Sequence, residues 1–208
     1  MDPTHILQSY DLVAEPYARK FAGELQHKPF DRLFLDGVAA KLSGKGPVVE
    51  LGCGPGHVAA YLHERGVDVV GTDLSPRMVA QAQGLFPAVP FRTLNMLELN
   101  LPDGSMCGLV AFYAVVNFEL AQVDTALREM RRVLMPGGLL AMSFHAGQET
   151  HHVEELLGCR VSMDFQFLDP AEMKVRLMRA GMVVDEMTVR PPYPEEYPSN
   201  RAYILARA

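Results

Sequence analysis

The spacing of hydrophobic and polar positions divides this 208-residue chain into alternating strand-like and helix-like segments. Short β-branched or apolar runs predict strands, and apolar residues at helical spacing predict helices. The expected strands cover residues 48–51, 67–72, 90–94, 106–114, 139–144, 182–189 and 201–206. The expected helices cover residues 8–26, 29–42, 57–65, 75–84, 123–134 and 169–180. Alternation of this kind is typical of an α/β fold with a mostly parallel sheet.

Residues 106–114 form a nearly continuous apolar run, which suits a central parallel strand buried on both faces. Residues 145–168 are less regular, with one short alternating segment at 161–167. A proline-rich turn at 191–194 then joins the last two expected strands in a hairpin-like return. The pattern therefore predicts one seven-stranded sheet covered by helices.

The first strand, a glycine-rich turn and the next helix meet at residues 48–65. After Glu50, glycine occupies every second position of the turn, at Gly52, Gly54 and Gly56. Glycine adopts positive φ readily and leaves no Cβ between the main chain and a ligand. The helix start offers unpaired N–H groups and a positive dipole end, which suit a cofactor with an anionic end. A loop that merely packs the helix on the strand is the alternative interpretation.

The pattern E-x-G-x-G-x-G at residues 50–56 resembles the first motif of class I S-adenosylmethionine-dependent methyltransferases, in particular small-molecule enzymes with a type 11 or type 25-like domain. Asp73 follows the second strand, at about the distance from the turn at which an acid reaches a ribose. Residues 131–138 match the family's R-x-L-x-P-G-G turn. The resemblance covers about residues 40–208, with its specific motifs in 48–138.

The resemblance implies a Rossmann-like three-layer sandwich with a mostly parallel seven-stranded sheet, its last strand antiparallel, plus N-terminal helices. We expect one domain over residues 1–208. Within it, residues 1–42 would be a helical lid or cap, 43–144 the cofactor-binding core, and 145–208 the substrate-side segment and C-terminal strands.

The resemblance also implies that S-adenosylmethionine is the cofactor and S-adenosylhomocysteine the product. Asp73 would hold the ribose hydroxyls. Asn95 stands where the family commonly has Asp, and its amide could still contact the adenine edge, with Met96 on the adenine face. The candidate cofactor-binding residues are Tyr10, Tyr17, Glu50, Gly52, Cys53, Gly54, Gly56, Asp73, Leu74, Asn95, Met96, Leu97 and Tyr113.

The first helix carries Tyr10 and Tyr17, seven residues apart and so on nearly the same face. It resembles the helix that lies across the cofactor mouth in many small-molecule methyltransferases. An aromatic face attracts a sulfonium much as it attracts an ammonium ion. A helix that only packs on the core is the alternative, because its apolar residues recur at helical spacing.

The sulfonium is already an activated methyl donor, so the acceptor needs alignment and, for some acceptors, a general base. The catalytic candidates are His145 and Tyr113, with His151, His152 and Glu119 as further possible bases. The segment 145–155 is rich in histidine and glutamate but matches no metal-ligand spacing, so we expect no metal. Residues 117–118 lack the Pro-Pro run of methyltransferases that act on nucleic-acid amino groups.

Composition and charge narrow the possible partners. The formal net charge of −6 argues against nucleic acid, and a small-molecule substrate is expected. No apolar run approaches 18 residues, and residues 1–5 do not read as a signal peptide, so we expect a cytoplasmic protein without membrane contact. Three widely spaced cysteines, Cys53, Cys107 and Cys159, suggest neither disulfides nor a zinc site.

The sequence therefore predicts an S-adenosylmethionine-dependent methyltransferase that transfers methyl in line to a small-molecule acceptor, as a monomer or homodimer. The acceptor atom (O, N, C or S) is open at this point. Two alternatives remain. One is a catalytically silent S-adenosylmethionine-binding module. The other is a nicotinamide-dependent oxidoreductase, against which His57 stands where a dinucleotide fingerprint needs its third glycine.

Overall fold

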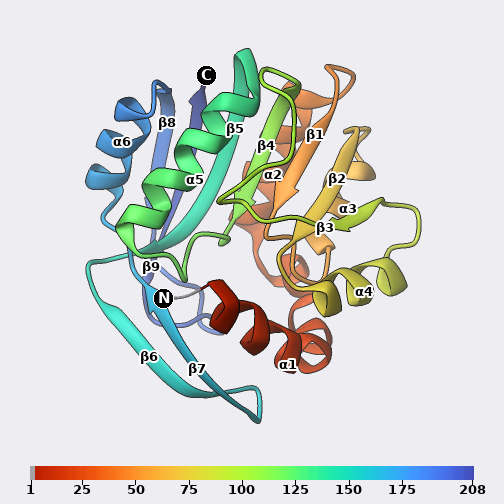
Figure 1. The fold of residues 1–208 in the computed structure, drawn as a ribbon, viewed down its shortest axis with the longest axis vertical. Helices are drawn as coiled ribbons and strands as arrows, with labels where there is room; N and C mark the ends of the chain where they lie inside the picture. Colours follow the sequence, from red (N-terminus) through yellow and green to blue (C-terminus); the bar gives the residue numbers. More distant parts are fainter. Residues whose placement is uncertain (1–2) are drawn as a thin grey trace.

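The computed structural model describes residues 3–208 (Figure 1). Its helices are α1 (Pro3–Phe21), the 3-10 helix η1 (Glu24–His27), α2 (Pro29–Leu42), α3 (His57–His63), α4 (Pro76–Leu85), α5 (Leu120–Val133) and α6 (Pro170–Arg179). Its strands are β1 (Val48–Leu51), β2 (Val69–Asp73), β3 (Phe91–Thr93), β4 (Met106–Phe112), β5 (Leu134–Ala146), β6 (Thr150–Leu156), β7 (Cys159–Gln166), β8 (Val183–Arg190) and β9 (Asn200–Arg207).

Seven of these strands form one sheet in the order β3-β2-β1-β4-β5-β9-β8. The pairs among β3, β2, β1, β4 and β5 are parallel, whereas β9 runs antiparallel to both of its neighbours. The predicted seven-stranded sheet with an antiparallel last strand is therefore confirmed. The carboxyl ends of β1, β2, β4 and β5 meet at one edge, where ligands bind in open α/β sheets.

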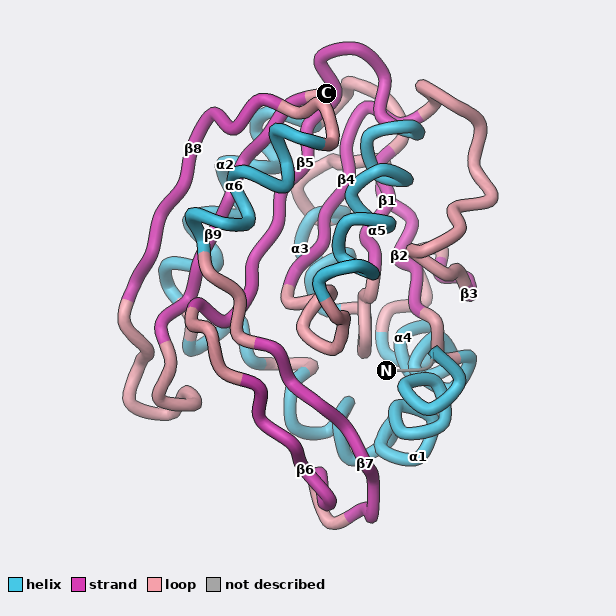
Figure 2. Tube along the Cα trace, turned by 60° about the vertical axis from the view of Figure 1, so that its left-hand side comes forward, coloured by secondary structure: helices cyan, strands magenta, loops and turns pink. Residues whose placement is uncertain are grey.

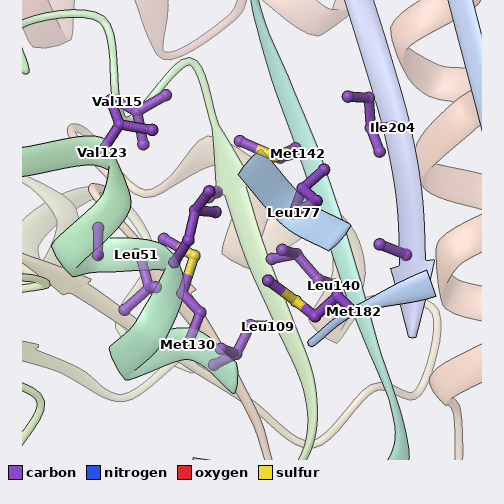
Figure 3. Close-up of a cluster of buried hydrophobic side chains, with 14 of the residues drawn as sticks. Leu51, Leu109, Val115, Val123, Met130, Leu140, Met142, Leu177, Met182 and Ile204 are labelled. Carbon is purple, nitrogen blue, oxygen red and sulfur yellow. The ribbon is translucent and has the colours of Figure 1, made fainter. Parts of the chain in front are cut away.

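Helices cover both faces of the sheet and give the three-layer sandwich. Successive residues of a strand point to opposite faces, so β1 sends Val49 and Leu51 into one apolar cluster and Val48 into another. The first cluster includes the buried faces of α5 and α6, seen in Figure 3 around Met130 and Leu177. The second includes residues of α2 and α3. The site-bearing edge thus rests on a sheet that is fixed from both sides.

The N-terminal helix differs from the expected 8–26. Helix α1 ends at Phe21, and a separate turn of 3-10 helix, η1, begins after Gly23. Glycine disfavours the helix interior because fixing its backbone costs more entropy than for other residues. The break lets the chain change direction, so α1 and η1 reach the sheet edge at different places.

Residues 145–168 differ more. The sequence predicted an irregular stretch with one short strand, but residues 150–166 form a two-stranded antiparallel hairpin, β6–β7. The turn consists of Leu157 and Gly158, both at positive φ, as a two-residue hairpin turn of type I′ requires. Strand β6 escaped prediction because its residues (THHVEEL) are mostly polar and show no apolar alternation.

Helix α1 and the β6–β7 hairpin, together called the cap below, lie side by side across the carboxyl edge of the sheet (Figures 1 and 2). They share a small apolar cluster in which Val13 and Ala14 of α1 meet Val161 and Met163 of β7 over Met78 of α4. Among residues 3–208, no helix has both the length and the apolar character required to span a membrane.

Candidate active site

A cavity of about 430 Å³ lies between the carboxyl edge of the sheet and the cap, within the usual ~300–1,000 Å³ of small-molecule sites. Most of the residues predicted from the sequence line it together: Tyr10, Tyr17, Glu50, Gly52, Cys53, Gly54, Asp73, Leu74, Asn95, Met96, Tyr113 and His145. Two predicted cofactor residues, Gly56 and Leu97, do not line it.

Gly56 and Leu97 have packing roles instead. Gly56 is the N-cap of α3 at φ +86°, and a Cβ there would lie 2.6 Å from the Phe91 ring. Leu97 packs against the α5-side core, and its N–H donates to the Asn95 side chain. Both residues shape the loops beside the cavity without facing it.

The glycine turn leaves open space in the cavity. Gly52 and Gly54 adopt φ +68° and +51°. A Cβ on Gly52 would lie 2.7 Å from Cβ of Ala114, so that position must stay glycine for packing. A Cβ on Gly54 would meet nothing closer than the Tyr17 ring at 3.7 Å. The space over Gly54 is therefore free for a ligand that lies against the main chain.

Glu50 is a buried residue of β1 that lines the cavity and carries an unsatisfied oxygen. Its Oε2 atom has no hydrogen-bond partner, although it is sealed from solvent. Burial, reinforced by the charge of Asp73, raises the pKa of Glu50 well above its usual range. Burial likewise raises the pKa of the adjacent Cys53 thiol. An orphaned carboxyl oxygen in a ligand cavity suits a donor group on the ligand, such as an amine.

Asp73 lies at the end of β2 and is fixed by main-chain donors. Its Oδ2 accepts a hydrogen bond from Gly54 N–H at 2.9 Å, and its Oδ1 accepts one from Ser75 N–H at 2.8 Å. Burial raises its pKa, although these N–H groups and that of Leu74 oppose the shift. Each carboxylate oxygen has a further lone pair for a hydroxyl in the cavity. The acid thus joins β2 to the glycine turn.

The loop after β3 orients the amide of Asn95. Its Oδ1 accepts a hydrogen bond from Leu97 N–H at 3.0 Å, which closes an Asx turn. The amide NH₂ is therefore the group available to a ligand, beside Met96. The sequence left open whether this amide would donate or accept, and the turn favours donation.

Helix α1 is attached to the rest of the site through its tyrosines. Tyr10 and Tyr17 contact each other edge to face, with ring centroids 6.1 Å apart. The Tyr10 hydroxyl donates to Oδ1 of Asn117 at 2.7 Å. Burial raises the pKa of both phenols, which keeps them neutral. At the outer side of α1, the Asp11 carboxylate accepts hydrogen bonds from Ser75 Oγ and Arg77 N–H.

Asn117 is a site residue whose role the sequence did not reveal. It is 5% exposed, it follows β4, and its Nδ2 donates to the carbonyl of Asp164 in β7 at 2.8 Å. Together with the Tyr10 contact, this bond connects both parts of the cap to the sheet edge. The only sequence signal was a polar residue placed directly after a long apolar run.

Tyr113 and His145 lie on the opposite wall, 5.4 Å apart between ring centroids. The Tyr113 backbone is strained at φ +54°, and its hydroxyl is 3.1 Å from that of Tyr203. Burial, with the charge of Asp31, raises the pKa of Tyr113 far above its usual range. Burial, with the charges of Arg201 and Lys28, lowers the pKa of His145 to about 3. Both groups are therefore neutral at pH 7.

A network of buried charges supports this wall. Arg190 donates to Asp31 Oδ1 at 2.8 Å and to both Glu196 oxygens at 2.7 and 2.9 Å. Lys28 donates to Glu24 at 2.7 Å and lies 3.7 Å from Glu196. Sequence reasoning missed the network because its members lie up to 172 positions apart and share no local pattern.

Burial alone would raise the pKa of Glu24, but the hydrogen bond from His57 and the nearby Lys28 lower it to about 2. His57, at the position a dinucleotide fingerprint reserves for glycine, thus ties η1 to the glycine turn through a contact of 3.1 Å. The residue that argued against a dinucleotide site has a defined structural partner here.

The other candidate bases lie away from the cavity lining. His152 contacts Asp164 within the hairpin at 2.7 Å, and His151 packs against Phe167. Glu119 is the N-cap of α5 and forms a capping box there. Across the described part of the chain, residues 3–208, no group of three or more His, Cys, Asp or Glu side chains is arranged to hold a metal ion.

Residues 48–138 match the family model described as a methyltransferase domain. The chain is 31% identical over 146 residues to demethylmenaquinone methyltransferase of Beutenbergia cavernae, which covers 68% of this chain and 58% of that protein. It is 29% identical over 133 residues to malonyl-[acyl-carrier protein] O-methyltransferase of Enterobacter lignolyticus, covering 63% and 52%.

The fold is similar to that of the DhpI–SAH complex, with a TM-score of 0.75, 21% identity, and coverage of 99% of this chain and 96% of that one. The chain spans about half the length of the curated relatives it matches first. The matched segment contains the glycine turn, Asp73 and the loop after β3, which are the parts that meet in the cavity. The chain therefore contains a domain of the class I S-adenosylmethionine-dependent methyltransferase family.

Proposed function

We propose that this chain binds S-adenosylmethionine and transfers its methyl group to a small-molecule acceptor. The observation that carries the proposal is the meeting of Glu50, Gly54 and Asp73 in one cavity at the carboxyl edge of the sheet. The orphaned carboxyl oxygen of Glu50 suits an amine of the ligand. The open main chain at Gly54 allows the ligand a close approach. The fixed carboxylate of Asp73 suits the hydroxyls of a ribose.

In this proposal Glu50 holds the amino group, Asp73 the ribose hydroxyls, and the Asn95 amide with Met96 the adenine. Tyr10 and Tyr17 cover the donor from the cap side. When bound, S-adenosylmethionine supplies an electrophilic methyl group, whose bond to sulfur breaks as the acceptor's lone pair forms the new bond. The cap limits access of water and holds the acceptor in line, which can contribute on the order of 7–11 kcal/mol to lowering a barrier.

The acceptor would lie against the wall of Tyr113 and His145, because the cavity extends there from the glycine turn. The two comparison enzymes are named for different acceptors, demethylmenaquinone and a malonyl group on an acyl-carrier protein. Their names therefore support methyl transfer in general, without indicating one acceptor for this chain.

The proposal is tested by calorimetric titration with S-adenosylmethionine and NADH, followed by a screen of small-molecule acceptors for release of S-adenosylhomocysteine. We expect saturable binding of S-adenosylmethionine, none of NADH, and turnover with a subset of acceptors. Binding of NADH alone would indicate an oxidoreductase. Tight donor binding with no turnover across the screen would indicate a silent binding module, and either result would contradict the proposal.

A further inference from the structure

The hydrogen bonds around His145 favour one of its two ring nitrogens as the carrier of the proton. Nδ1 lies 2.8 Å from Oγ of Ser199, and the same Oγ accepts a hydrogen bond from Nη1 of Arg201 at 2.8 Å. A serine hydroxyl has one hydrogen to donate. A guanidinium can only donate, so the Arg201 contact leaves the Ser199 hydrogen available, and donation to Nδ1 of His145 lets the hydroxyl use both its donor and an acceptor lone pair. With Nδ1 as the acceptor, the neutral ring carries its proton on Nε2.

The Nε2 atom is open to the cavity. The His145 ring lines the cavity wall and is stacked on Phe167 at 5.1 Å between centroids. Nε2 has no protein partner. Among residues 3–208, four unpartnered side-chain atoms are sealed from solvent, and they belong to Asp31, Glu50, His57 and Arg176. Nε2 is not one of them, so it is accessible. A donor N–H therefore faces the space beside Tyr113, where the acceptor would lie.

Other unspent hydrogen-bonding groups on this wall are also donors. Arg201 is 3% exposed and lines the cavity, and its described hydrogen bonds all use Nη1, which leaves Nη2 unpaired. Lys28 donates only to Glu24 and has two further N–H groups. The carboxylates behind them, Glu24 and Glu196, are already hydrogen-bonded. Glu195 also lines the cavity, where it is an exposed carboxylate with a claim on the same donors.

We infer that His145 is a neutral hydrogen-bond donor to the acceptor molecule, and that this molecule presents a carbonyl or carboxylate oxygen to Nε2–H. This inference rests on the proposed function and deepens it, since it assigns a substrate class to the same cavity. His145 would be a catalytic residue that contacts the acceptor, and Ser199 a positioning residue that fixes its tautomer.

The charges facing His145 agree with a neutral ring. The cations of Arg201 and Lys28 disfavour protonation, and burial acts in the same direction, while Glu196 and Glu24 oppose it only in part. Tyr113 and Tyr197 contact the ring through their own aromatic rings. A donor of this kind strengthens as negative charge gathers on the acceptor's oxygen, and it does not need to take up a proton.

The first test measures the tautomer directly by ¹⁵N NMR of the full chain labelled at histidine, with His145→Gln used for assignment. We expect a protonated Nε2 and an unprotonated Nδ1, unchanged from pH 8 to pH 5. Ser199→Ala should allow exchange between tautomers, and Ser199→Thr, which keeps the hydroxyl, should restore the wild-type signals. A proton on Nδ1, or an imidazolium at pH 6, would overturn the inference.

The second test uses matched acceptor pairs in the turnover screen, each carbonyl or carboxylate compound beside an analogue without that oxygen. Active members should carry the oxygen. His145→Ala should lower kcat/KM for them about ten-fold or more, as expected for one lost hydrogen bond to a charged group. His145→Gln, which still presents an N–H, should keep most of it, and both variants should bind S-adenosylmethionine normally.

Active acceptors that lack the oxygen, or an oxygen preference that survives in His145→Ala, would contradict the inference while leaving methyl transfer intact. If no compound is methylated, the proposed function is contradicted, whereas the NMR measurement still decides the donor assignment of His145. The two failures are therefore distinguishable.

Discussion

The hydroxyl of Tyr10 donates to Oδ1 of Asn117 across 2.7 Å, joining the first helix to the end of the central strand β4 over a sequence separation of 107 residues. Asn117 also donates to the Asp164 carbonyl, so a single buried amide connects both parts of the cap to the sheet edge. The closure of the cavity therefore depends on a few polar contacts at its centre as well as on the apolar cluster between α1 and β7.

Tyr10→Phe removes the donor and leaves the buried Oδ1 of Asn117 unpaired. Loss of one such bond is worth about 0.5–1.5 kcal/mol. We expect roughly a three- to ten-fold loss of S-adenosylmethionine affinity, with faster amide exchange in α1 and β7. Calorimetry and hydrogen–deuterium exchange provide the measurements. Tyr61→Phe is the matched control, because its hydroxyl bonds to Asp36 away from the cavity lining.

The same exchange data distinguish two roles of α1: a lid, which closes over the bound donor, and a brace, which only packs on the core. A lid would show slower exchange of the α1 amides when S-adenosylmethionine is added, whereas a brace would show equal protection with and without it. The buried side chains of Val13 and Ala14 show that α1 also rests on a core of its own. Equal protection, together with unchanged affinity in Tyr10→Phe, would remove the two tyrosines from the site.

Asp73→Ala should weaken S-adenosylmethionine binding at least ten-fold, because hydrogen bonds to a charged group are worth about 1.5–3 kcal/mol. The variant also loses the bond from Gly54 N–H, so its melting temperature must be measured beside the calorimetric titration. Asp68→Ala, just before the other end of the same strand, should bind the donor normally. Unchanged affinity in a folded Asp73→Ala protein would exclude the ribose assignment.

Gly54→Val places a side chain in the open space over the turn and should abolish donor binding. The positive φ of Gly54 adds strain of about 1–3 kcal/mol, so a loss of stability is expected as well. Gly44→Val is the control, since Gly44 has φ +69° and open space around it but does not line the cavity. Both variants should lose stability in urea unfolding, and only Gly54→Val should lose binding. If Gly54→Val retained its affinity for S-adenosylmethionine, the turn would only pack the helix on the strand.

Stability should fall in acid through Glu196. Burial alone would raise the pKa of Glu196, but its bonds to Arg190 and the N–H of Tyr193, with the charge of Arg201, lower it from 4.5 to about 2. A carboxyl whose folded pKa is depressed stabilises the protein above its unfolded pKa. That contribution should be lost as pH falls from about 4.5 to about 2.

Glu196→Gln should flatten this pH dependence in urea titrations and should itself cost a few kcal/mol at pH 7, because Arg190 loses a buried partner. Asp185→Asn removes the more exposed pair with Arg207 and should cost about 0–1 kcal/mol. Equal effects of the two variants would mean that the buried network contributes no more than a surface pair.

The sheet could be predicted because its signals are local. The buried runs of β1, β4 and β5 are mostly apolar, and helices with their own start and stop residues separate β1 from β2, β2 from β3 and β4 from β5. The glycine turn and Asp73 were found for the same reason, because they follow the ends of β1 and β2 at a fixed spacing from each other. The hairpin lacked any such signal, since β6 packs mainly through its partner strand and the cap.

The wall of Tyr113 and His145 could be predicted from the sequence only in part. His145 and Tyr113 were found because each lies near the carboxyl end of a strand, but the contacts that favour one tautomer of His145 come from Ser199 and Arg201, more than 50 residues later. Burial, with the cations of Arg201 and Lys28, lowers the pKa of His145 to about 3, and no local sequence pattern indicates this shift. Contacts of this kind depend on tertiary placement, and no spacing rule encodes them.

The β6–β7 hairpin leaves and rejoins the sheet at nearly one point, where Ala146 at the end of β5 is bridged to Leu168 just before α6. Such an insertion can be lengthened, shortened or exchanged without altering the strand order or the glycine turn. For the engineer, the hairpin is a segment that can be exchanged while the sheet beneath it keeps its connections.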